Sequence, residues 1–314
     1  MTSADTIITK YRPAKFADVI GQDVAVRSLR QVLAKRSSRA FLFTGQSGVG
    51  KTTLARIVAC EVGCGHGDLI EVDAATHTGI DAMRAVQDLL EYRPISGGVR
   101  AIIIDEAHAL SKASFQSMLK VLEEPPTWAF WLLCTTEPTR VPAAIVTRCV
   151  RCDLKSVGQP LLVEFIDGVV DAEKMKLGDD ASKIIGLCAR EAGGSPRQAL
   201  INLAMCDGAK SFTEARELLR SAEQSRDAVE LARALVRGAK WPEVQGLLRD
   251  LRDIGPESIR HVIRAYATKI VLDANSEKAA ARGMYILDAF SEPCATQDGI
   301  SPIVIACGRV VLGD

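Results

Sequence analysis

The sequence has no long hydrophobic run and no excess of either charge. None of its 314 residues lies in a stretch approaching the roughly 18 consecutive apolar residues of a membrane span, so we expect no membrane association. Lysine plus arginine total 39, and aspartate plus glutamate also total 39. Any nucleic-acid binding must therefore come from a local basic patch and not from a global positive field. With 47% apolar and 25% charged residues, the composition is that of an ordinary soluble globular protein.

The sequence also lacks a secretion leader and a disulfide framework. Its first residues, MTSADTIITKYRP, do not show the charged, apolar and small-residue segments of a signal peptide, so we expect a cytoplasmic protein. The nine cysteines have no short regular spacing, which suits a reducing compartment. Zinc is an alternative at Cys60, Cys64 and His66, but a structural zinc site usually takes four ligands in two close pairs.

What the sequence does contain is an alternation of β-branched runs and helical patterns in its first half. This alternation is typical of a parallel sheet covered by helices. We predict strands at Ala40–Thr44, Leu69–Asp73, Ala101–Asp105 and Phe130–Thr135. From about Leu154 onward only helical patterns remain. The length allows two or three domains, and we predict an α/β domain at residues 1–153, a small helical domain at 154–215 and an all-helical domain at 216–314.

A phosphate-binding loop is predicted directly after the first strand. The run from Gly45 to Thr52, GQSGVGKT, lies between an apolar strand and a helix, as this pattern requires. Backbone N–H groups and Lys51 would hold the phosphates of ATP, while the Thr52 hydroxyl would bind Mg²⁺. The alternative is a glycine-rich turn that binds nothing, which would not need the flanking strand and helix. The expected nucleotide contacts are Gly45, Gln46, Ser47, Gly48, Val49, Gly50, Lys51, Thr52 and Thr53.

Two carboxylates end the third predicted strand. Asp105 and Glu106 follow four apolar residues at the sheet edge where open α/β folds bind ligands. We expect Asp105 to hold Mg²⁺ and Glu106 to polarise the water that attacks ATP. An intact Glu106 favours hydrolysis over nucleotide binding alone. We interpret His108 as structural.

Several motifs together resemble one family. They are Lys10–Pro13, Phe16–Gln22, Gly45–Thr52, Asp68–Ala74, Asp105–His108, Leu122–Pro126 and Thr147–Cys149. In this order and spacing they resemble the AAA+ clamp-loader ATPases, which include the bacterial DNA polymerase III tau/gamma subunit and the phage clamp-loader large subunit. The resemblance implies an ATPase that opens the sliding clamp and loads it on primer-template DNA. Its partners would be further ATPase copies and an accessory subunit, with residues 154–215 as a lid domain and 216–314 as a collar for oligomerisation.

The resemblance also implies roles for single residues. Thr136 would be sensor 1 near the γ-phosphate, with Thr135 as the alternative. Arg148 would be the arginine finger supplied in trans to a neighbouring subunit's ATP, and Arg197 would be sensor 2. The adenine and ribose pocket would be lined by Tyr11, Arg12, Pro13, Val19 and Ile20.

The Arg197 prediction has independent support from helix signals. Ser195 is a good N-cap and Pro196 a good first helical residue, which places Arg197 in the first turn. A cation at the positive end of a helix is unfavourable unless an anion lies nearby. A phosphate would supply that anion.

A candidate DNA-binding stripe lies on the helix that we expect to begin near Ser111. Lys112, Gln116 and Lys120 recur at steps of four and share one face. The resemblance implies that this face and the loop at Thr76–Gly79, including His77, lie along the DNA backbone. The loop departs from the relatives, which carry basic residues at the His77 and Gly79 positions. The alternative is an ordinary solvated helix face.

Two departures favour a phage protein, and two other functions stay open. Residues 60–67 connect a helix directly to the next strand, where the bacterial subunit has a zinc module, and we expect no long C-terminal extension. The first alternative is a non-hydrolysing stator subunit, which would lose P-loop or Asp105-Glu106 residues. The second is a branch-migration helicase, which would carry a winged-helix domain with strands after Leu154.

Overall fold

The computed structural model describes residues 4–76, 80–90, 92–95, 98–252, 254–274, 276–294 and 299–313. The chain divides into two compact units. Unit 1 is Met1–Phe212 and unit 2 is Thr213–Asp314. The predicted division at residues 153 and 215 stays a prediction, and one helix, α10 (Phe212–Arg237), runs across residue 215.

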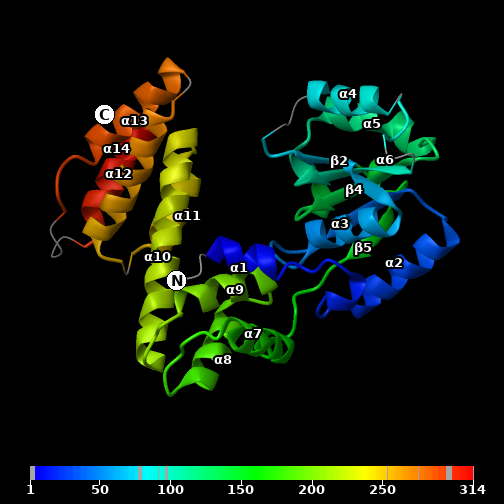
Figure 1. The fold of residues 1–314 in the computed structure, drawn as a ribbon. Helices are drawn as coiled ribbons and strands as arrows, with labels where there is room; N and C mark the ends of the chain where they lie inside the picture. Colours follow the sequence, from blue (N-terminus) through cyan, green and yellow to red (C-terminus); the bar gives the residue numbers. More distant parts are fainter. Residues whose placement is uncertain are drawn as a thin grey trace. The chain divides into compact units, whose positions relative to one another are not determined.

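Unit 1 is built on a five-stranded sheet in which every neighbouring pair is parallel. The strand order is β2-β3-β4-β1-β5 (Figure 1). The strands are β1 (Ala40–Thr44), β2 (Cys64–Asp73), β3 (Val99–Asp105), β4 (Ala129–Thr135) and β5 (Val150–Asp153). The central strands β1, β3 and β4 are almost continuously apolar and buried, as expected for strands covered on both faces.

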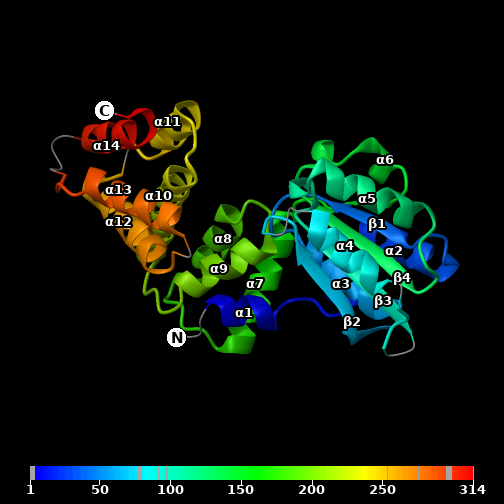
Figure 2. The ribbon, with the colours of Figure 1, turned by 90° about the horizontal axis from the view of Figure 1, so that it is seen from above.

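Helices cover both faces of this sheet, as Figures 1 and 2 show. On one face, α4 (Ile80–Leu89), α5 (Lys112–Glu123) and α6 (Ala143–Val146) share a buried core with β1, β3 and β4. On the other face, α2 (Asp23–Lys35) and α3 (Lys51–Glu61) pack on the alternate residues of the same strands. The carboxyl ends of β1 and β3 therefore meet at one edge, next to the start of α3.

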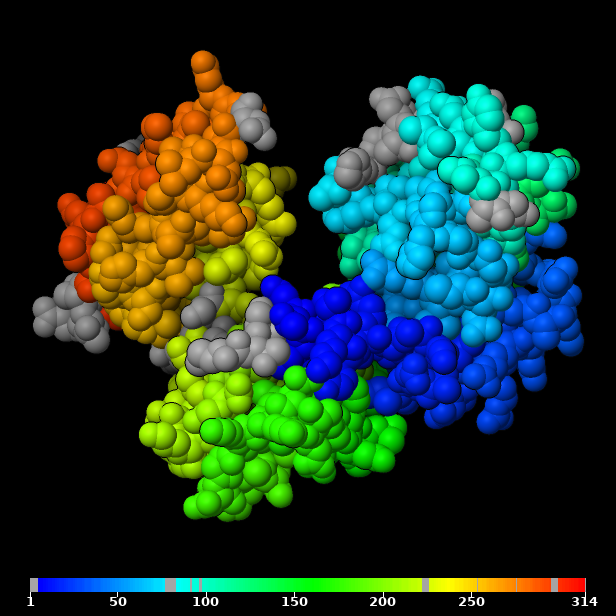
Figure 3. All heavy atoms as spheres, in the orientation of Figure 1, coloured from blue at the N-terminus to red at the C-terminus, as the bar shows by residue number. Residues whose placement is uncertain are grey.

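Three helices follow the sheet within unit 1. They are α7 (Gln159–Glu173), α8 (Ala181–Glu191) and α9 (Pro196–Met205). The N-terminal helix α1 (Ala4–Lys10) packs against α9 through the fully buried Ile7. Figure 3 shows the dark-blue atoms near the N-terminus directly beside the green atoms. The helix before the sheet and the helices after it are therefore packed together.

Unit 2 contains helices and no strand among its described residues. Its helices are α10, α11 (Trp241–Asp250), α12 (Pro256–Leu272), α13 (Glu277–Ala289) and α14 (Ser301–Leu312). Both α11 and α12 have a proline in their first turn, Pro242 and Pro256. Apolar side chains from all five helices form one core. Among the described residues of the whole chain, no helix has the length and apolar character needed to cross a membrane.

The predicted fold class is confirmed: a parallel α/β sheet with flanking helices is followed by helices, with no further strand in the part of the chain that the structure describes. Two strand predictions were incomplete. β5 was missed, because it is an edge strand of four residues in which only Cys152 is buried. β2 begins five residues before the predicted Leu69, in the glycine-containing run Cys64–Asp68, with a register shift against β3.

Candidate nucleotide-binding site

The P-loop lies between β1 and α3 and depends on three glycines. Gly45, Gly48 and Gly50 have φ values of 143°, 76° and 108°, which side-chain-bearing residues rarely adopt. A Cβ at Gly48 would lie 2.2 Å from the Ser195 hydroxyl oxygen, at the start of α9. A Cβ at Gly45 would lie 2.6 Å from the Leu154 carbonyl oxygen. The glycines therefore allow both the turn itself and its close packing against later parts of unit 1.

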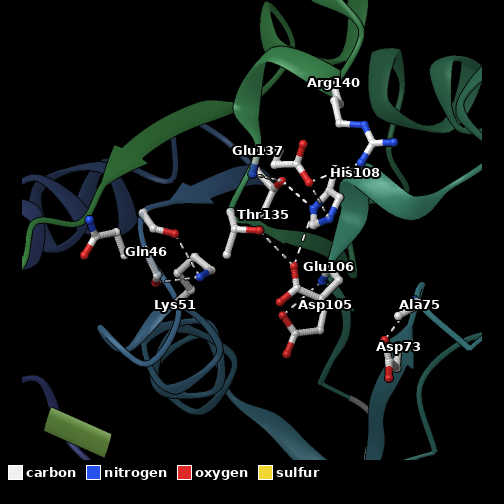
Figure 4. Close-up of polar contacts among 12 residues, drawn as sticks. Gln46, Lys51, Asp73, Ala75, Asp105, Glu106, His108, Thr135, Glu137 and Arg140 are labelled. Atoms are coloured by element: carbon white, nitrogen blue, oxygen red, sulfur yellow. Dashed lines mark hydrogen bonds and ion pairs between the residues drawn. The ribbon is translucent and has the colours of Figure 1, made fainter. Parts of the chain in front are cut away.

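Lys51 is buried at the first position of α3. Only 6% of the residue is exposed, and its Nζ donates to the carbonyl oxygens of Gly45 at 2.9 Å and Gln46 at 2.8 Å (Figure 4). Burial lowers the pKa of Lys51, while the nearby carboxylates of Glu106 and Asp105 oppose that shift. The ammonium group has three donors, so it keeps capacity for a further acceptor.

The Thr52 hydroxyl donates to Oδ2 of Asp105 at 2.8 Å. This contact joins the start of α3 to the end of β3. Hydroxyl and carboxylate oxygens are ligands that Mg²⁺ prefers, and Mg²⁺ usually takes one or two protein ligands together with phosphates and waters. The two predicted metal residues are therefore placed together and fit the ion.

Glu106 follows Asp105 in an unusual backbone conformation. Its φ is 49°, in the left-handed region, and its N–H donates to Oδ1 of Asp105 at 3.1 Å. Its Oε2 accepts from the Thr136 hydroxyl at 3.3 Å. Of the two sensor 1 candidates, Thr136 thus reaches Glu106, whereas the buried Thr135 contacts Nδ1 of His108 and accepts from the Glu137 N–H.

One pocket of about 920 Å³, part of it open to solvent, adjoins these groups. Its lining includes the predicted residues Tyr11, Arg12, Pro13, Val19, Ile20, Ser47, Gly48, Val49, Gly50, Lys51, Thr52, Thr53, Asp105, Glu106 and Arg197. Gly45, Gln46 and Thr136 do not line it; Gly45 and Gln46 instead hold Lys51 through their carbonyls. Sequence reasoning missed the lining residues Ile8, Asp18, Phe165, Pro196 and Leu200. The apolar ones among them resemble core residues, and only their place in the fold identifies them.

The N-terminal wall of the pocket is tied to α7. The Tyr11 hydroxyl donates to Oε1 of Glu173 at 2.7 Å, and Lys10 forms an ion pair with the same oxygen at 2.6 Å. Partial burial and this carboxylate raise the pKa of Tyr11 to about 12, so the phenol stays a donor. The segment that carries Arg12 and Pro13 is thereby anchored beside the pocket.

Arg197 faces the P-loop from the start of α9. The expected helix start is confirmed: Ser195 is the N-cap, its hydroxyl accepts from the Gln198 N–H at 3.2 Å, and Pro196 is the first helical residue. A Cβ on Gly48 would lie 3.3 Å from Cβ of Arg197. The cation therefore lies at the positive end of a helix, beside the predicted phosphate site.

The zinc alternative concerns residues away from this pocket. Cys60 is exposed near the end of α3, and Cys64 and His66 lie on β2. Within the described ranges, no group of three or more histidine, cysteine or acidic side chains is arranged to hold a metal ion.

Known proteins resemble this chain in sequence. A family model described as DNA polymerase III, delta subunit, matches residues 65–158. DNA polymerase III subunit tau of Bacillus subtilis is 36% identical over 225 residues, which cover 65% of this chain and 39% of that protein. The Escherichia coli subunit tau is 34% identical over 281 residues, or 81% of this chain and 43% of that protein. These matches support a clamp-loader AAA+ family assignment.

The chain spans less than half of the length of these two clamp-loader relatives. Among solved structures, the RuvB Holliday junction branch migration motor of Thermotoga maritima superposes with a TM-score of 0.58. That match covers 85% of this chain and 94% of RuvB at 18% identity. At this identity the likeness shows the fold alone, and it agrees with the AAA+ class.

Arg148, the predicted arginine finger, does not line the pocket. It lies just after α6, where it donates to the Ala144 carbonyl oxygen at 2.7 Å and pairs with Glu123 at the end of α5. Its side chain is 32% exposed. The function of Arg148 as an arginine finger for another subunit stays a prediction, and a finger acting in trans would lie outside its own subunit's pocket.

The stripe of residues that we predict to contact DNA lies on α5. Ser111 caps this helix by accepting from the Ser114 N–H at 3.1 Å, as expected. Lys112, Gln116 and Lys120 are exposed, whereas Phe115 and Met118 are buried against the sheet. The three polar residues therefore form one exposed stripe, while His77 lies outside the described residues.

Proposed function

We propose that this chain is an ATPase subunit of a sliding-clamp loader. The observation that carries the proposal is the convergence of Lys51, Thr52, Asp105, Glu106 and Arg197 on one pocket. A nucleotide-binding protein without hydrolysis would not need Glu106 beside the Thr52–Asp105 pair. The identity to two DNA polymerase III tau subunits supports the clamp-loading part.

Each group has a definite task in the proposed hydrolysis. Lys51 binds the β- and γ-phosphates, and Thr52 and Asp105 would hold Mg²⁺. When bound, this ion would supply positive charge to offset the negative charge of the phosphates. Glu106 accepts a proton from water as the water oxygen bonds to the γ-phosphorus and the bond to the β-γ bridging oxygen breaks, giving ADP and phosphate. Arg197 and Thr136 orient the γ-phosphate.

The partners we propose are further copies of this ATPase, an accessory subunit, the sliding clamp and primer-template DNA. ATP at the subunit interfaces would favour a spiral of subunits that holds an opened clamp. DNA would favour the same state, so the two ligands promote each other's binding. Arg148 would complete a neighbour's site, and DNA would lie along Lys112, Gln116 and Lys120. Hydrolysis would then release the clamp on DNA.

We propose that the protein acts in phage DNA replication, in the cytoplasm of an infected bacterial cell. This proposal is supported by the direct connection from α3, which ends at Glu61, to β2, which begins at Cys64. The proposed domains are the P-loop domain at residues 1–153, a lid at 154–215 and an oligomerising collar at 216–314.

A branch-migration motor is the second candidate, because RuvB, which is such a motor, has the same fold. Against it, unit 2 contains helices but no strand among its described residues. A stator is less favoured, since Lys51, Thr52, Asp105 and Glu106 are all present.

Turnover of ATP by the full chain tests the proposal. It should be measured alone, then with the accessory subunit, the clamp and primed DNA, beside Glu106→Gln. We expect clamp and primed DNA together to stimulate turnover, and Glu106→Gln to lower it by roughly 100-fold while fluorescent-nucleotide binding persists. Stimulation by a four-way junction, with indifference to clamp and primed DNA, would identify the branch-migration motor instead. Full turnover by Glu106→Gln would contradict the assigned base.

A further inference from the structure

His108 lies between two carboxylates at the edge of the candidate site. Its Nδ1 is 3.4 Å from Oε2 of Glu106 and 3.1 Å from the Thr135 hydroxyl oxygen. Its Nε2 is 3.3 Å from Oε1 of Glu137 (Figure 4). Only 13% of the imidazole is exposed. Both ring nitrogens are therefore engaged, one toward the proposed catalytic base and one away from it.

The contacts continue from His108 to the protein surface. Glu137 begins the turn η3 (Pro138–Arg140), and its N–H donates to the Thr135 hydroxyl at 3.0 Å. Its Oε1 pairs with Arg140 at 3.1 Å, and both side chains are about half exposed. The chain of contacts thus runs from Glu106 through His108 to Glu137 and Arg140.

Glu106 has a backbone conformation that residues with a side chain rarely adopt. It caps the turn η2 (Ala107–Ala109) in the left-handed region, which a residue with a side chain keeps only when surrounding contacts hold it there. Among the described residues, contacts to the carboxylate come from Thr136 at 3.3 Å and His108 at 3.4 Å, and both are to Oε2. These contacts leave Oε1 available to a water. Long contacts of this kind often shorten when a substrate binds.

We propose that His108 is a positioning residue: it holds Oε2 of Glu106 so that Oε1 meets the attacking water, and Glu137 in turn fixes the imidazole. This inference rests on the proposed function of Glu106 as the base. It replaces the interpretation of His108 as a purely structural residue, since a space-filling residue would not require a carboxylate at each nitrogen.

The first test compares substitutions at His108 in the full chain. His108→Ala should lower kcat by roughly 10- to 100-fold, with the affinity for a fluorescent ATP analogue and the melting temperature nearly unchanged. His108→Asn should restore part of kcat, because its amide N–H can replace Nδ1 toward Glu106. His261→Ala is the matched control, since His261 is an exposed histidine of unit 2 that also contacts a glutamate, Glu257. Unchanged kcat in His108→Ala would overturn the proposal, as would equal losses in kcat, affinity and melting temperature.

A double substitution separates this proposal from the proposed function. If His108 acts only through Glu106, then His108→Ala should have no further effect on kcat in the Glu106→Gln background. An additional loss there would overturn the positioning role. If Glu106→Gln alone keeps full activity, the proposed base itself is wrong. If Glu106→Gln is inactive and His108→Ala is fully active, only the positioning role is wrong.

A spectroscopic test does not depend on turnover. The chain has four histidines, so NMR signals of the imidazole nitrogens can be assigned by comparison with His108→Asn. Glu106→Gln should shift the Nδ1 signal of His108, and Glu137→Gln should shift its Nε2 signal. Absence of either shift would overturn the bridge between the two carboxylates.

Discussion

Two buried cations at opposite ends of the same sheet, Lys51 and Arg100, differ in what they hold. Each is 6% exposed. Lys51, after the carboxyl end of β1, donates to two carbonyl oxygens of its own loop. Arg100, near the start of β3, forms a buried ion pair with Asp68 at 3.2 Å and donates to the carbonyl oxygens of Leu89, Tyr92 and Arg93.

A cation that binds a ligand differs from a structural one in the hydrogen-bonding capacity that it keeps. The charge of Arg100 is paired with the Asp68 carboxylate, and its N–H groups donate to carbonyl oxygens at the end of α4 and just after it. Few donors therefore remain for a ligand. Lys51 has no carboxylate among its hydrogen-bond partners in the described residues, and burial lowers its pKa. Burial alone does not distinguish the two; the unused capacity of Lys51 does.

Arg148 lies between these two cases and gives the largest expected effect. Its guanidinium pairs with Glu123 and donates to the Ala144 carbonyl oxygen, and its side chain is partly exposed. If it acts in trans, Arg148→Ala in the assembled complex should lower clamp- and DNA-stimulated hydrolysis by about 10³-fold, because an arginine finger stabilises transition-state charge. ATP binding by each subunit should stay within about twofold, since the finger acts mainly on the transition state.

The control for Arg148 is Arg151→Ala, because Arg151 is an exposed, ion-paired arginine three residues away. It should keep stimulated turnover. Loss of ATP binding in Arg148→Ala would mean that this residue serves its own subunit's site and not a neighbour's.

A matched pair of substitutions tests the Lys51–Arg100 comparison itself. Asp68→Ala leaves the Arg100 charge buried without its partner and should lower the free energy of unfolding by about 3–5 kcal/mol, measured by chemical denaturation. The folded variant should still bind ATP normally. Lys51→Met should do the reverse: ATP affinity should fall roughly 10- to 100-fold, while stability should not fall, since an ammonium held at a cost is removed. Loss of stability in Lys51→Met would show that Lys51, like Arg100, stabilises the fold.

Much of unit 1 could be predicted because its signals are local. The P-loop and the Asp105-Glu106 pair are contiguous motifs, and the buried runs of β1, β3 and β4 read directly as strands. Arg197 was also predictable, since the cap and proline before it mark the start of α9.

What escaped prediction depends on contacts between distant segments. Phe165 and Leu200 line the pocket from α7 and α9, yet by sequence they are ordinary apolar helix residues. His108 looked structural because Glu137, its second carboxylate, lies on a turn after β4, nearly thirty residues away. The sequence did not indicate that Arg100 forms a buried ion pair, because its partner Asp68 lies on another strand. Such pairings arise only when the strands are placed side by side.

Substitution of Lys120 gives the smallest expected effect on activity. In contrast to the buried Arg100, Lys120 is exposed in the last turn of α5. A cation in the last turn also suits the helix dipole, so its presence alone does not indicate DNA binding. If Lys120 contacts a DNA phosphate, Lys120→Ala should lower DNA-stimulated ATPase activity about two- to threefold, and the slope of log binding against log salt should fall by about 1. Lys35→Ala, at the exposed end of α2, is the control with the same charge change. An unchanged salt slope in Lys120→Ala would leave the helix dipole as the sufficient explanation, and the stripe on α5 would then be a solvated face and not a path for DNA.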